Sequence, residues 1–537
     1  MRFYLKRLAM VAVGGLTLSL MLLSLPSSSL HRGESNGDVE LSAAVDDGQQ
    51  QAPRHLMGLK ELKTFPSQVD VGKHSGGPAA DISLRYNKFA RSVDNELVAY
   101  LEEKLAPFAD STDDELRALE CPENVTLIDH FKQLGKRIPR RDNWERWYAD
   151  ITSCDLHRNE AVIDALLKDL AQLPLKHVAI MDGGTQIKLL FTYENGKRAV
   201  FKPMRFGRDY DTDPNHFYFS EFERHNAEIA TFYLDRILGF HRALPTTGRV
   251  VNLKTDIRDK AEKALTKTTF WSPAKNLCFV GKCDYFCETS FAVCGSPLLK
   301  EGSVQAFLPD EEQVPRKHSR SPYRRTYSKR SQKANWQSDM TYCSWKVKNK
   351  AAFHKGRRIL DLMDLHILDF LNGNQDRHHI ESFTVFEKIM GYAIHLDNGR
   401  GFGRPAEDDT DILLPLTQCC VIRPRTLRRL VQFYKGPKSL TETLHEAMSN
   451  DAAAPVLAQK HYVAVERRLQ TILRTVQTCL EKAEDPLHVL QSSFVNPKVT
   501  PRRTSASKKE TEPDAAAVAD EQEEDEDEED DDKKEVQ

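Results

Sequence analysis

The sequence predicts an α+β fold with two lobes, a small lobe of antiparallel strands and a larger helical lobe, preceded by a helical extension. Short apolar runs separated by turn residues at positions 177–203 have the pattern of strands. Before and after this region, apolar residues recur at every third or fourth position, which is typical of helices. Ten cysteines, an even number, indicate that disulfide bonds stabilise the fold.

The chain begins with the pattern of a targeting segment. Residues 1–7 carry basic side chains, and the apolar stretch that follows is close to the shortest length that spans a bilayer. Because no clear cleavage site follows Pro26, residues 1–25 are interpreted as a type II signal anchor, with a cleaved signal peptide as the alternative. Residues 26–80 are rich in Ser, Gly, Asp and Gln and are expected to form a disordered stem.

The helical extension is expected at residues 81–175. One helix should cover residues 93–105 and open near Asp94, and another should cover residues 155–173.

The small lobe and hinge are expected at residues 176–310. A long helix is predicted from Ser220 to Leu238, ending at Gly239. Turns at residues 182–184 and 194–196 separate the predicted strands, which are residues 177–181, 186–193 and 198–203.

The large lobe is expected at residues 311–490. It should contain a nearly all-apolar, buried helix at residues 359–371, ending at Gly373, and a final amphipathic helix at residues 461–480. Residues 491–537 are expected to be a disordered tail that is acidic at its end.

The cysteines and one sequence triplet bear on the cellular compartment. Four cysteines lie close together, with a spacing that lacks the paired Cys-x2-Cys of zinc sites, so disulfides are preferred over zinc: Cys278, Cys283, Cys287 and Cys294. Asn124-Val125-Thr126 is an acceptor triplet for glycosylation at Asn124. Both features fit an oxidising secretory compartment, as the leader does.

Two aspartates carry the chemistry. Asp376 lies in a polar loop after the buried helix, and a predicted hairpin of residues 383–386 and 392–395 separates it from Asp397, which glycines follow. Protein kinases place their catalytic and metal-binding loops in this order. Phosphoryl transfer needs one carboxylate to accept the proton of the attacking hydroxyl and another to hold the metal that bridges the ATP phosphates. Asp376 suits the first role and Asp397 the second.

Each aspartate alone also fits a structural role. Asp376 and Arg377 could form a salt bridge within a turn, and Asp397 could cap the Gly-rich turn that follows it. Their joint order and spacing favour the kinase interpretation. Glu381 stands where typical kinases carry a metal-binding Asn, and its oxygens suit a metal ligand or a hydrogen-bond acceptor for the nucleotide.

The strands supply a candidate nucleotide-binding lysine, Lys202, although it also fits a surface charge at the end of a strand. The turn at Gly183-Gly184-Thr185-Gln186 could cover phosphates, but it lacks G-x-G-x-x-G and is weak by itself. Glu223 is a site candidate, and Ser220 with Glu223 also has the pattern of a helix capping box. Glu228 is a further acidic residue of this predicted helix, and it could instead bond to backbone or to Arg224.

Over residues 182–480 the chain resembles the secretory-pathway Golgi casein kinase family, also called the "family with sequence similarity twenty". The resemblance lies in five long motifs: Phe201-Lys202-Pro203-Met204, Glu223-Arg224-His225-Asn226-Ala227-Glu228-Ile229-Ala230, Asp376-Arg377-His378-His379, His395-Leu396-Asp397-Asn398 and Gln418-Cys419-Cys420. It implies an atypical protein-kinase-like fold.

The resemblance also implies roles for the site residues. Asp376 would be the catalytic base, and Glu223 and Asp397 would bind Mn²⁺, with Mg²⁺ as the alternative metal. ATP would be the phosphate donor. Its implied contacts are Gln186, Lys202, Glu381 and Asp397, with the hinge residues Gln305, Ala306, Phe307 and Leu308 holding the adenine.

The resemblance further implies four disulfides, which sequence alone cannot choose: Cys278–Cys294, Cys283–Cys287, Cys343–Cys419 and Cys420–Cys479. Cys121 and Cys154 remain, and we expect them to form a fifth bridge.

The family contains serine protein kinases for acidic Ser-x-Glu sites, a kinase for xylose in the proteoglycan linker, and a pseudokinase in which Gln replaces the helix Glu. The retained Glu223 argues against the pseudokinase, and residues 398–403 resemble the protein-kinase branch. We therefore expect a secretory serine protein kinase, with the other two kinds as alternatives.

The expected partners and location follow from this interpretation. Basic residues at positions 316–333 suit acidic secretory-protein substrates, although they also fit a solvated charge run. We expect residence in the Golgi lumen or secretion, membrane contact only through the anchor, and no nucleic-acid partner. A homodimer or a heterodimer with a paralogue is compatible with the resemblance.

Overall fold

The structure, a computed structural model, describes residues 92–495 apart from 182, 214–215, 218–220, 327–332, 387–388 and 390. All of these residues belong to one compact unit, Pro78–Gln537. The predicted signal anchor and stem, and nearly all of the predicted tail, lie outside the described residues. No helix in the described part of the chain is long and apolar enough to cross a membrane.

A five-stranded antiparallel sheet forms the small lobe, in the order β1-β2-β3-β8-β4. Its central strand is β3, which pairs with β2 on one side and β8 on the other. Phe191 and Phe201 stack at 4.7 Å in its core. The strands are β1 (Leu175–Ile180), β2 (Leu189–Tyr193), β3 (Arg198–Pro203), β4 (Thr246–Asn252) and β8 (Leu299–Ala306). The sheet confirms the predicted α+β class.

Helix α9 (His225–Leu238) packs on β4 and β8 and ends at Gly239, whose φ of 76° suits glycine. It begins five residues later than predicted. The Arg224 backbone N–H donates to the Gly399 carbonyl at 2.6 Å, which ties the chain ahead of α9 to the large lobe. Glu223 therefore precedes the helix and is not the third residue of α9, as the alternative of a capping box with Ser220 would require. Ser220 lies outside the described residues.

The large lobe is built around α12 (Arg358–Asn372), which is buried along almost its whole length and packs on α9, α13 and α16. Gly373 ends it with a φ of 74°. The surrounding helices are α11 (Asn335–Ser338), α13 (Leu414–Cys419), α14 (Pro424–Lys435), α15 (Leu440–Met448) and α16 (Gln459–Lys482).

The predicted hairpin between the two aspartates is wrong. Strand β11 (His379–Phe383) pairs with β9 (Arg316–Arg320), and among the described residues of the two predicted strands and their surroundings an isolated bridge joins Glu381 to Ile394. Thr384 N–H continues the ladder by donating to the Pro315 carbonyl. Because β9 lies more than fifty residues upstream, local patterning could not indicate this pairing. The pairing also places Arg316–Arg320, the start of the basic segment at residues 316–333, in a strand.

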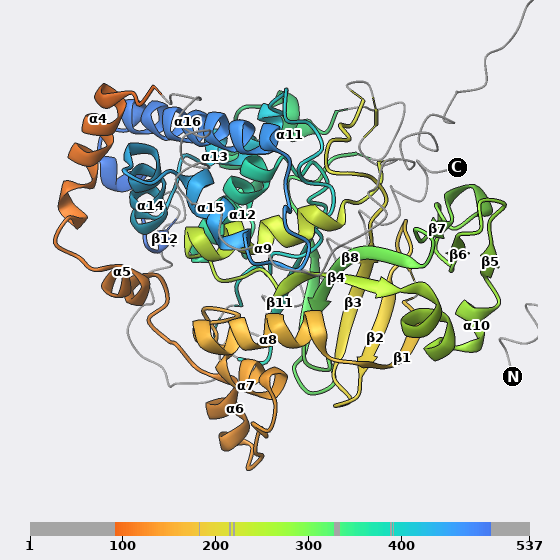
Figure 1. Cartoon of the computed structure of the whole chain (residues 1–537). Helices are drawn as coiled ribbons and strands as arrows, with labels where there is room; N and C mark the ends of the chain where they lie inside the picture. Colours follow the sequence, from red (N-terminus) through yellow and green to blue (C-terminus); the bar gives the residue numbers. More distant parts are fainter. Residues whose placement is uncertain are drawn as a thin grey trace, which may run out of the picture. The chain divides into compact units, whose positions relative to one another are not determined.

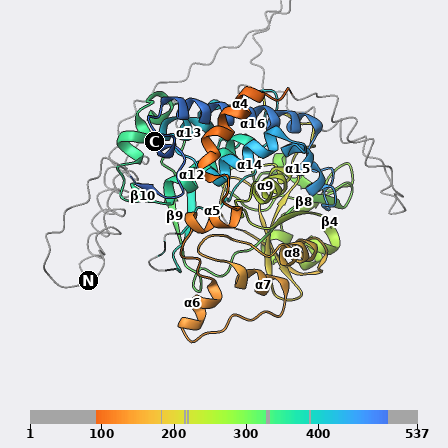
Figure 2. The ribbon, with the colours of Figure 1, turned by 90° about the vertical axis from the view of Figure 1, so that its left-hand side faces the viewer.

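The helical extension contacts both lobes (Figures 1 and 2). Helix α4 packs on α14 and α16 of the large lobe, whereas α8 packs on β4 and β8 of the small lobe. Asp94 caps α4, as predicted, but α8 begins at Glu160 rather than near residue 155 because Asn159 caps it. The helices are α4 (Asn95–Leu105), α5 (Asp113–Glu120), α6 (Leu127–Gln133), α7 (Asn143–Asp150) and α8 (Glu160–Gln172).

Smaller elements complete the described chain. A three-stranded sheet lies beside the small lobe (Figure 1), and β10 and β12 form a two-stranded sheet. These elements are α10 (Lys263–Thr266), β5 (Thr269–Trp271), β6 (Leu277–Phe279), β7 (Val293–Cys294), β10 (Lys355–Gly356) and β12 (Phe494–Val495).

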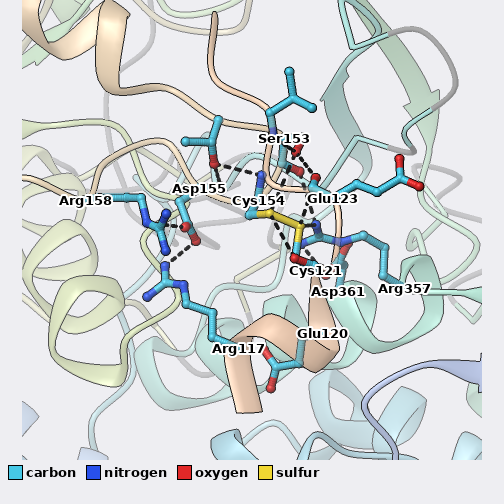
Figure 3. Close-up of a disulfide and its surroundings, with 12 residues drawn as sticks. Arg117, Glu120, Cys121, Glu123, Ser153, Cys154, Asp155, Arg158, Arg357 and Asp361 are labelled. Atoms are coloured by element: carbon cyan, nitrogen blue, oxygen red, sulfur yellow. Dashed lines mark hydrogen bonds and ion pairs between the residues drawn. A yellow bond between two sulfur atoms is a disulfide. The ribbon is translucent and has the colours of Figure 1, made fainter. Parts of the chain in front are cut away.

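Five disulfides are formed, and they use all ten cysteines. Four are the pairs implied by the family resemblance, and the fifth joins Cys121 to Cys154. Figure 3 shows this fifth bridge against Arg357, whose Nη1 lies 3.2 Å from Cys121 Sγ and donates to the Ser153 carbonyl at 3.1 Å. The disulfide itself joins two residues of the extension. Because Arg357 immediately precedes α12, its contacts with Cys121 and Ser153 hold this part of the extension against the start of that buried helix.

Candidate active site

Four charged side chains converge between the lobes. The ammonium of Lys202 on β3 lies 2.5 Å from Glu228 Oε1, 2.9 Å from Glu223 Oε2 and 3.4 Å from Asp397 Oδ1. Glu228 is on α9, Glu223 lies two residues before the start of α9, and Asp397 follows the bridged residues 394 and 395 of the large lobe. The structure thus brings together three residues that the sequence singled out, and Lys202 is not a surface charge.

Glu228 is the residue that sequence reasoning undervalued. It is 1% exposed, and its Oε2 accepts from the Asn398 backbone N–H while its Oε1 contacts Lys202. Protein kinases hold their nucleotide-binding lysine with a helix glutamate in the same way. Its position inside a buried helix turn, beside apolar Ile229 and Ala230, was the available signal.

The charges of this cluster stabilise one another. Burial opposes the charged form of Lys202, but Glu223, Glu228 and Asp397 outweigh burial and raise its pKa well above the usual value. The Lys202 ammonium in turn lowers the pKa of Asp397, and Lys188 and Arg377 add to this effect. The Asp397 side chain is 69% exposed, so a charged carboxylate faces open space at the edge of the cluster.

Asp376 lies in the loop after α12, where it contacts residues outside the Lys202 cluster. Asn374 Oδ1 accepts from its backbone N–H at 3.1 Å, and Arg400 Nε lies 3.3 Å from its Oδ2. Its carboxylate is 12% exposed. Asp376 forms an ion pair with Arg400, which lies in the loop after Asp397. The alternative salt bridge between Asp376 and Arg377 is not the one observed, because Arg377 pairs with Asp369.

Arg377 joins the two aspartate loops. Its guanidinium donates to both oxygens of the buried Asp369 on α12 at 2.8 Å, and to Asn398 Oδ1 at 2.8 Å. It also donates to the Leu396 carbonyl. Because one rigid, planar group contacts α12 and the residues on both sides of Asp397, the spacing of Asp376 and Asp397 is set by the buried core.

Gln186 supports Glu223 from the small lobe. Its Nε2 donates to the Glu221 carbonyl, its Oε1 accepts from the Glu223 backbone N–H, and both distances are 3.0 Å. The turn before it is held by the Cys283–Cys287 loop, because Asp284 N–H donates to Gly184 O and Phe286 N–H donates to Thr185 O. This brace was not predicted.

Gly399 allows the two lobes to approach each other at Glu223. A Cβ at this position would lie 2.9 Å from Glu223 Cβ and 3.1 Å from its Oε2. The glycine after Asp397-Asn398 is therefore required by close contact, not by an unusual backbone conformation.

The remaining predicted contacts lie around this cluster. Gln305 and Ala306 end β8, and Phe307 and Leu308 follow it toward the large lobe, as a hinge would. Phe307 N–H donates to the Arg198 carbonyl, and Tyr148 Oη donates to the Phe307 carbonyl. Glu381 pairs with Arg316 on the neighbouring strand at 2.5 Å. Contacts of these residues with a nucleotide remain predictions.

The donor set fits a hard divalent cation. Glu223 and Asp397 both place a carboxylate oxygen within 3.4 Å of the same ammonium, and they are the partly exposed acids of the cluster. Carboxylate oxygens are the ligands that Mn²⁺ and Mg²⁺ prefer. A lysine, paired carboxylates and a separate aspartate are the functional groups that enzymes use for phosphoryl transfer.

Comparison with known proteins agrees with this arrangement. Residues 142–486 match a family model described as Golgi casein kinase, C-terminal, Fam20. The chain is 51% identical over 502 residues to the extracellular serine/threonine protein kinase CeFam20 of Caenorhabditis elegans, covering 93% of this chain and 96% of that relative.

Two solved structures are similar in fold and sequence. A crystal structure of the Golgi casein kinase matches with a TM-score of 0.74 and 55% identity, covering 80% of this chain and 98% of that chain. A Golgi casein kinase with Mn/ADP bound matches with a TM-score of 0.70 and 53% identity, covering 81% and 98%. These matches confirm the resemblance and the kinase-like fold predicted from the motifs. The chain belongs to the Fam20 family of Golgi casein kinases and is a kinase of that family.

Proposed function

We propose that this chain is a secretory-pathway serine protein kinase that transfers the γ-phosphate of ATP to Ser-x-Glu sites of secreted proteins. The observation that carries the proposal is the contact of Lys202 with Glu223, Glu228 and Asp397. Asp376 adds a separate carboxylate in the loop after α12. The Mn/ADP-bound relative supports ATP and Mn²⁺ as the cofactors, with Mg²⁺ as the alternative metal.

Each residue has a role in this proposal. Asp376 accepts the proton of the attacking serine hydroxyl, and Lys202, oriented by Glu228, binds phosphate oxygens. Glu223 and Asp397 hold the metal, so that charge on the ATP phosphates is neutralised by Mn²⁺ when it is bound. The remaining ATP contacts of the proposal are Gln186, Glu381 and the hinge residues Gln305, Ala306, Phe307 and Leu308.

Acidic substrates are supported by the basic residues near Asp376. Strand β9, with Lys317 and Arg320, pairs with β11, which starts three residues after Asp376. Within this segment, Arg316 pairs with Glu381 and Arg325 pairs with Asp409. In the proposal, basic side chains of the segment such as Lys317, Arg320 and Arg324 attract the acidic residues of the substrate. Lys329 and Arg330 lie outside the described residues.

The compartment is also part of the proposal. Asn124 is exposed ahead of α6, as a glycosylation site must be, and the five disulfides suit an oxidising lumen. Golgi residence through a type II anchor, or secretion after cleavage, follows from the leader at residues 1–25. Assembly as a homodimer or with a paralogue remains a prediction.

The test is to incubate the full chain with labelled ATP and Mn²⁺ and to offer three acceptors together. These are a Ser-x-Glu peptide, the same peptide with Gln in place of Glu, and a xylose-bearing linker oligosaccharide. We expect label in the Ser-x-Glu peptide above the other two. Label in the oligosaccharide alone would identify a xylose kinase, and no transfer to any acceptor would favour a pseudokinase.

A further inference from the structure

A second group of metal-binding side chains lies away from the candidate active site. His157, Glu160 and His241 each offer one ligand atom, and these atoms lie within 4.8 Å of one another. His157 is in the segment ahead of α8, Glu160 is the first residue of α8, and His241 follows the end of α9. The group therefore joins the helical extension to the segment after the helix that carries Glu228.

His157 has an unusual environment for a histidine. It is 1% exposed, and neither Nδ1 nor Nε2 of its ring has a hydrogen-bond partner among the described residues. Burying a polar nitrogen without a partner destabilises a fold, so two such atoms on one ring require an explanation. A bound metal ion would supply a partner for one of these two nitrogens.

The neighbouring residues are already oriented toward His157. The His241 ring lies 4.9 Å from the His157 ring, and its Nδ1 is 3.1 Å from the His157 carbonyl oxygen and 4.0 Å from Glu160 Oε1. Metal-binding histidines are commonly fixed by a backbone carbonyl in this way. His241 has a φ of 57°, a backbone conformation uncommon outside glycine.

Glu160 can bind a cation without losing its other partner. Its Oε2 pairs with Arg236 of α9, whereas its Oε1 is the atom that faces His241. Arg236 is also held by Asp164 at 2.8 Å. The charge of Arg236 is thus shared by two acids, and one oxygen of Glu160 remains directed at the histidines.

We propose that His157, Glu160 and His241 form a second metal site, which takes Zn²⁺ and connects the helical extension to the end of α9. Two imidazoles and one carboxylate, with water at an open position, are a common Zn²⁺ donor set. The all-carboxylate pair Glu223 and Asp397 instead favours Mn²⁺ or Mg²⁺. The two sites share no residue. Because their donor atoms differ, each site should prefer a different ion, and binding at the two sites can be measured separately.

The test measures Zn²⁺ binding to the full chain, stripped with a chelator and then saturated with Mn²⁺ and ADP to occupy the active-site carboxylates. We expect one Zn²⁺ per chain, measured by competition with a chromophoric chelator and by elemental analysis. Glu160→Gln should weaken Zn²⁺ binding by at least ~10-fold. Mutating a residue that only supports a metal ligand already lowers metal affinity by about this factor, and Glu160 is proposed as a ligand itself.

Asp164→Asn is the matched control. It lies one turn further along α8 and removes the other acid that holds Arg236, but no ligand. Its Zn²⁺ affinity should equal that of the wild type. Equal Zn²⁺ affinity in Glu160→Gln and the wild type would overturn the proposal, and so would an equal loss in both variants.

His157→Phe provides a second readout, because it keeps a buried ring against Phe232 and His241. With chelator present, this variant should unfold at or above the temperature of the wild type, since two unpartnered nitrogens are removed. With Zn²⁺ present, only the wild type should gain thermal stability. A gain of the same size in His157→Phe would show that the ion binds elsewhere and contradict the site.

Discussion

Lys202 and its three acids show how the candidate site depends on individual contacts. Three carboxylates surround one ammonium, and each comes from a different point of the chain. The partly exposed Glu223 and the exposed Asp397 are available to a metal, whereas the buried Glu228 holds the lysine. The same residue type therefore has two roles, which are distinguished by exposure.

Replacing Asp376 tests the proposed base. Asp376→Asn keeps the size of the side chain and its position beside Arg400, but it cannot accept a proton. We expect kcat to fall at least ~100-fold with little change in KM for ATP, since general-base removal typically costs this much. Asp164→Asn, on the surface of α8, is the control for an equivalent change elsewhere. Unchanged kcat in Asp376→Asn would remove Asp376 from the mechanism.

Gly399→Ala tests the close approach of the lobes. The added methyl group would lie 2.9 Å from Glu223 Cβ and displace that carboxylate. We expect activity to fall about 10-fold or more, because small displacements of positioning groups are costly, and the Mn²⁺ concentration needed for half-maximal rate should rise. Gly207→Ala is the matched control, since a Cβ there meets no atom within 4 Å. Equal kinetics in the two variants would contradict this account.

At the scale of elements, local patterns predicted what local interactions determine. Strand β3 was predicted to the residue because it forms a tight hairpin with β2 around Gly196. The start of α9 was not predicted correctly, because the Arg224 backbone N–H is bound by the Gly399 carbonyl of the other lobe. The β9–β11 pairing was missed for the same reason. Long-range contacts are absent from any short window of sequence.

The site follows the same rule. Asp376, Asp397 and Lys202 could be proposed from order, spacing and strand position. Choosing between Glu223 and Glu228 required knowing where α9 begins, because this decides which acid is buried and which faces the open side of the cluster. The brace of the Gly183-Gly184 turn by the Cys283–Cys287 loop depends on a contact between distant segments, and no sequence signal indicated it.

The disulfides permit a test at the element scale. Cys121 and Cys154 are 33 residues apart, and their bridge lies against Arg357 at the start of α12. Replacing both by Ala should lower the free energy of unfolding by about 3–4 kcal/mol, from loop closure in the unfolded chain.

The matched comparison is the Cys283–Cys287 bridge, which closes a separation of only four residues. Its removal should cost less, about 2 kcal/mol, by the same argument. Urea unfolding of both double variants measures the difference. A larger loss from the short bridge would show that native contacts, rather than loop length, determine the effect.

At the scale of the whole molecule, buried histidines predict how stability depends on pH. Burial lowers the pKa of His366 and of His461 to about 4 in the folded chain, against roughly 6.5 when unfolded. The unfolded chain therefore binds more protons between these values. Stability should be full above about pH 6.5 and fall progressively toward pH 4, by roughly 3 kcal/mol per histidine at most.

Urea unfolding at about pH 7 and about pH 5 checks this dependence. His461→Phe keeps an aromatic ring against Phe402 but removes one titrating group. The difference between the two pH values should therefore be smaller in this variant than in the wild type. An identical pH dependence would mean that His461 does not contribute.

The proposed mechanism requires that Glu223 and Asp397 bind the catalytic metal beside Lys202, which makes this family member an active kinase. The most direct measurement is the initial rate of γ-phosphate transfer from ATP to a Ser-x-Glu peptide over a Mn²⁺ titration, for the wild type and Glu223→Gln. We predict transfer by the wild type and a loss of at least ~100-fold in Glu223→Gln that added Mn²⁺ does not restore. Full activity in Glu223→Gln, or no transfer by the wild type, would contradict the account.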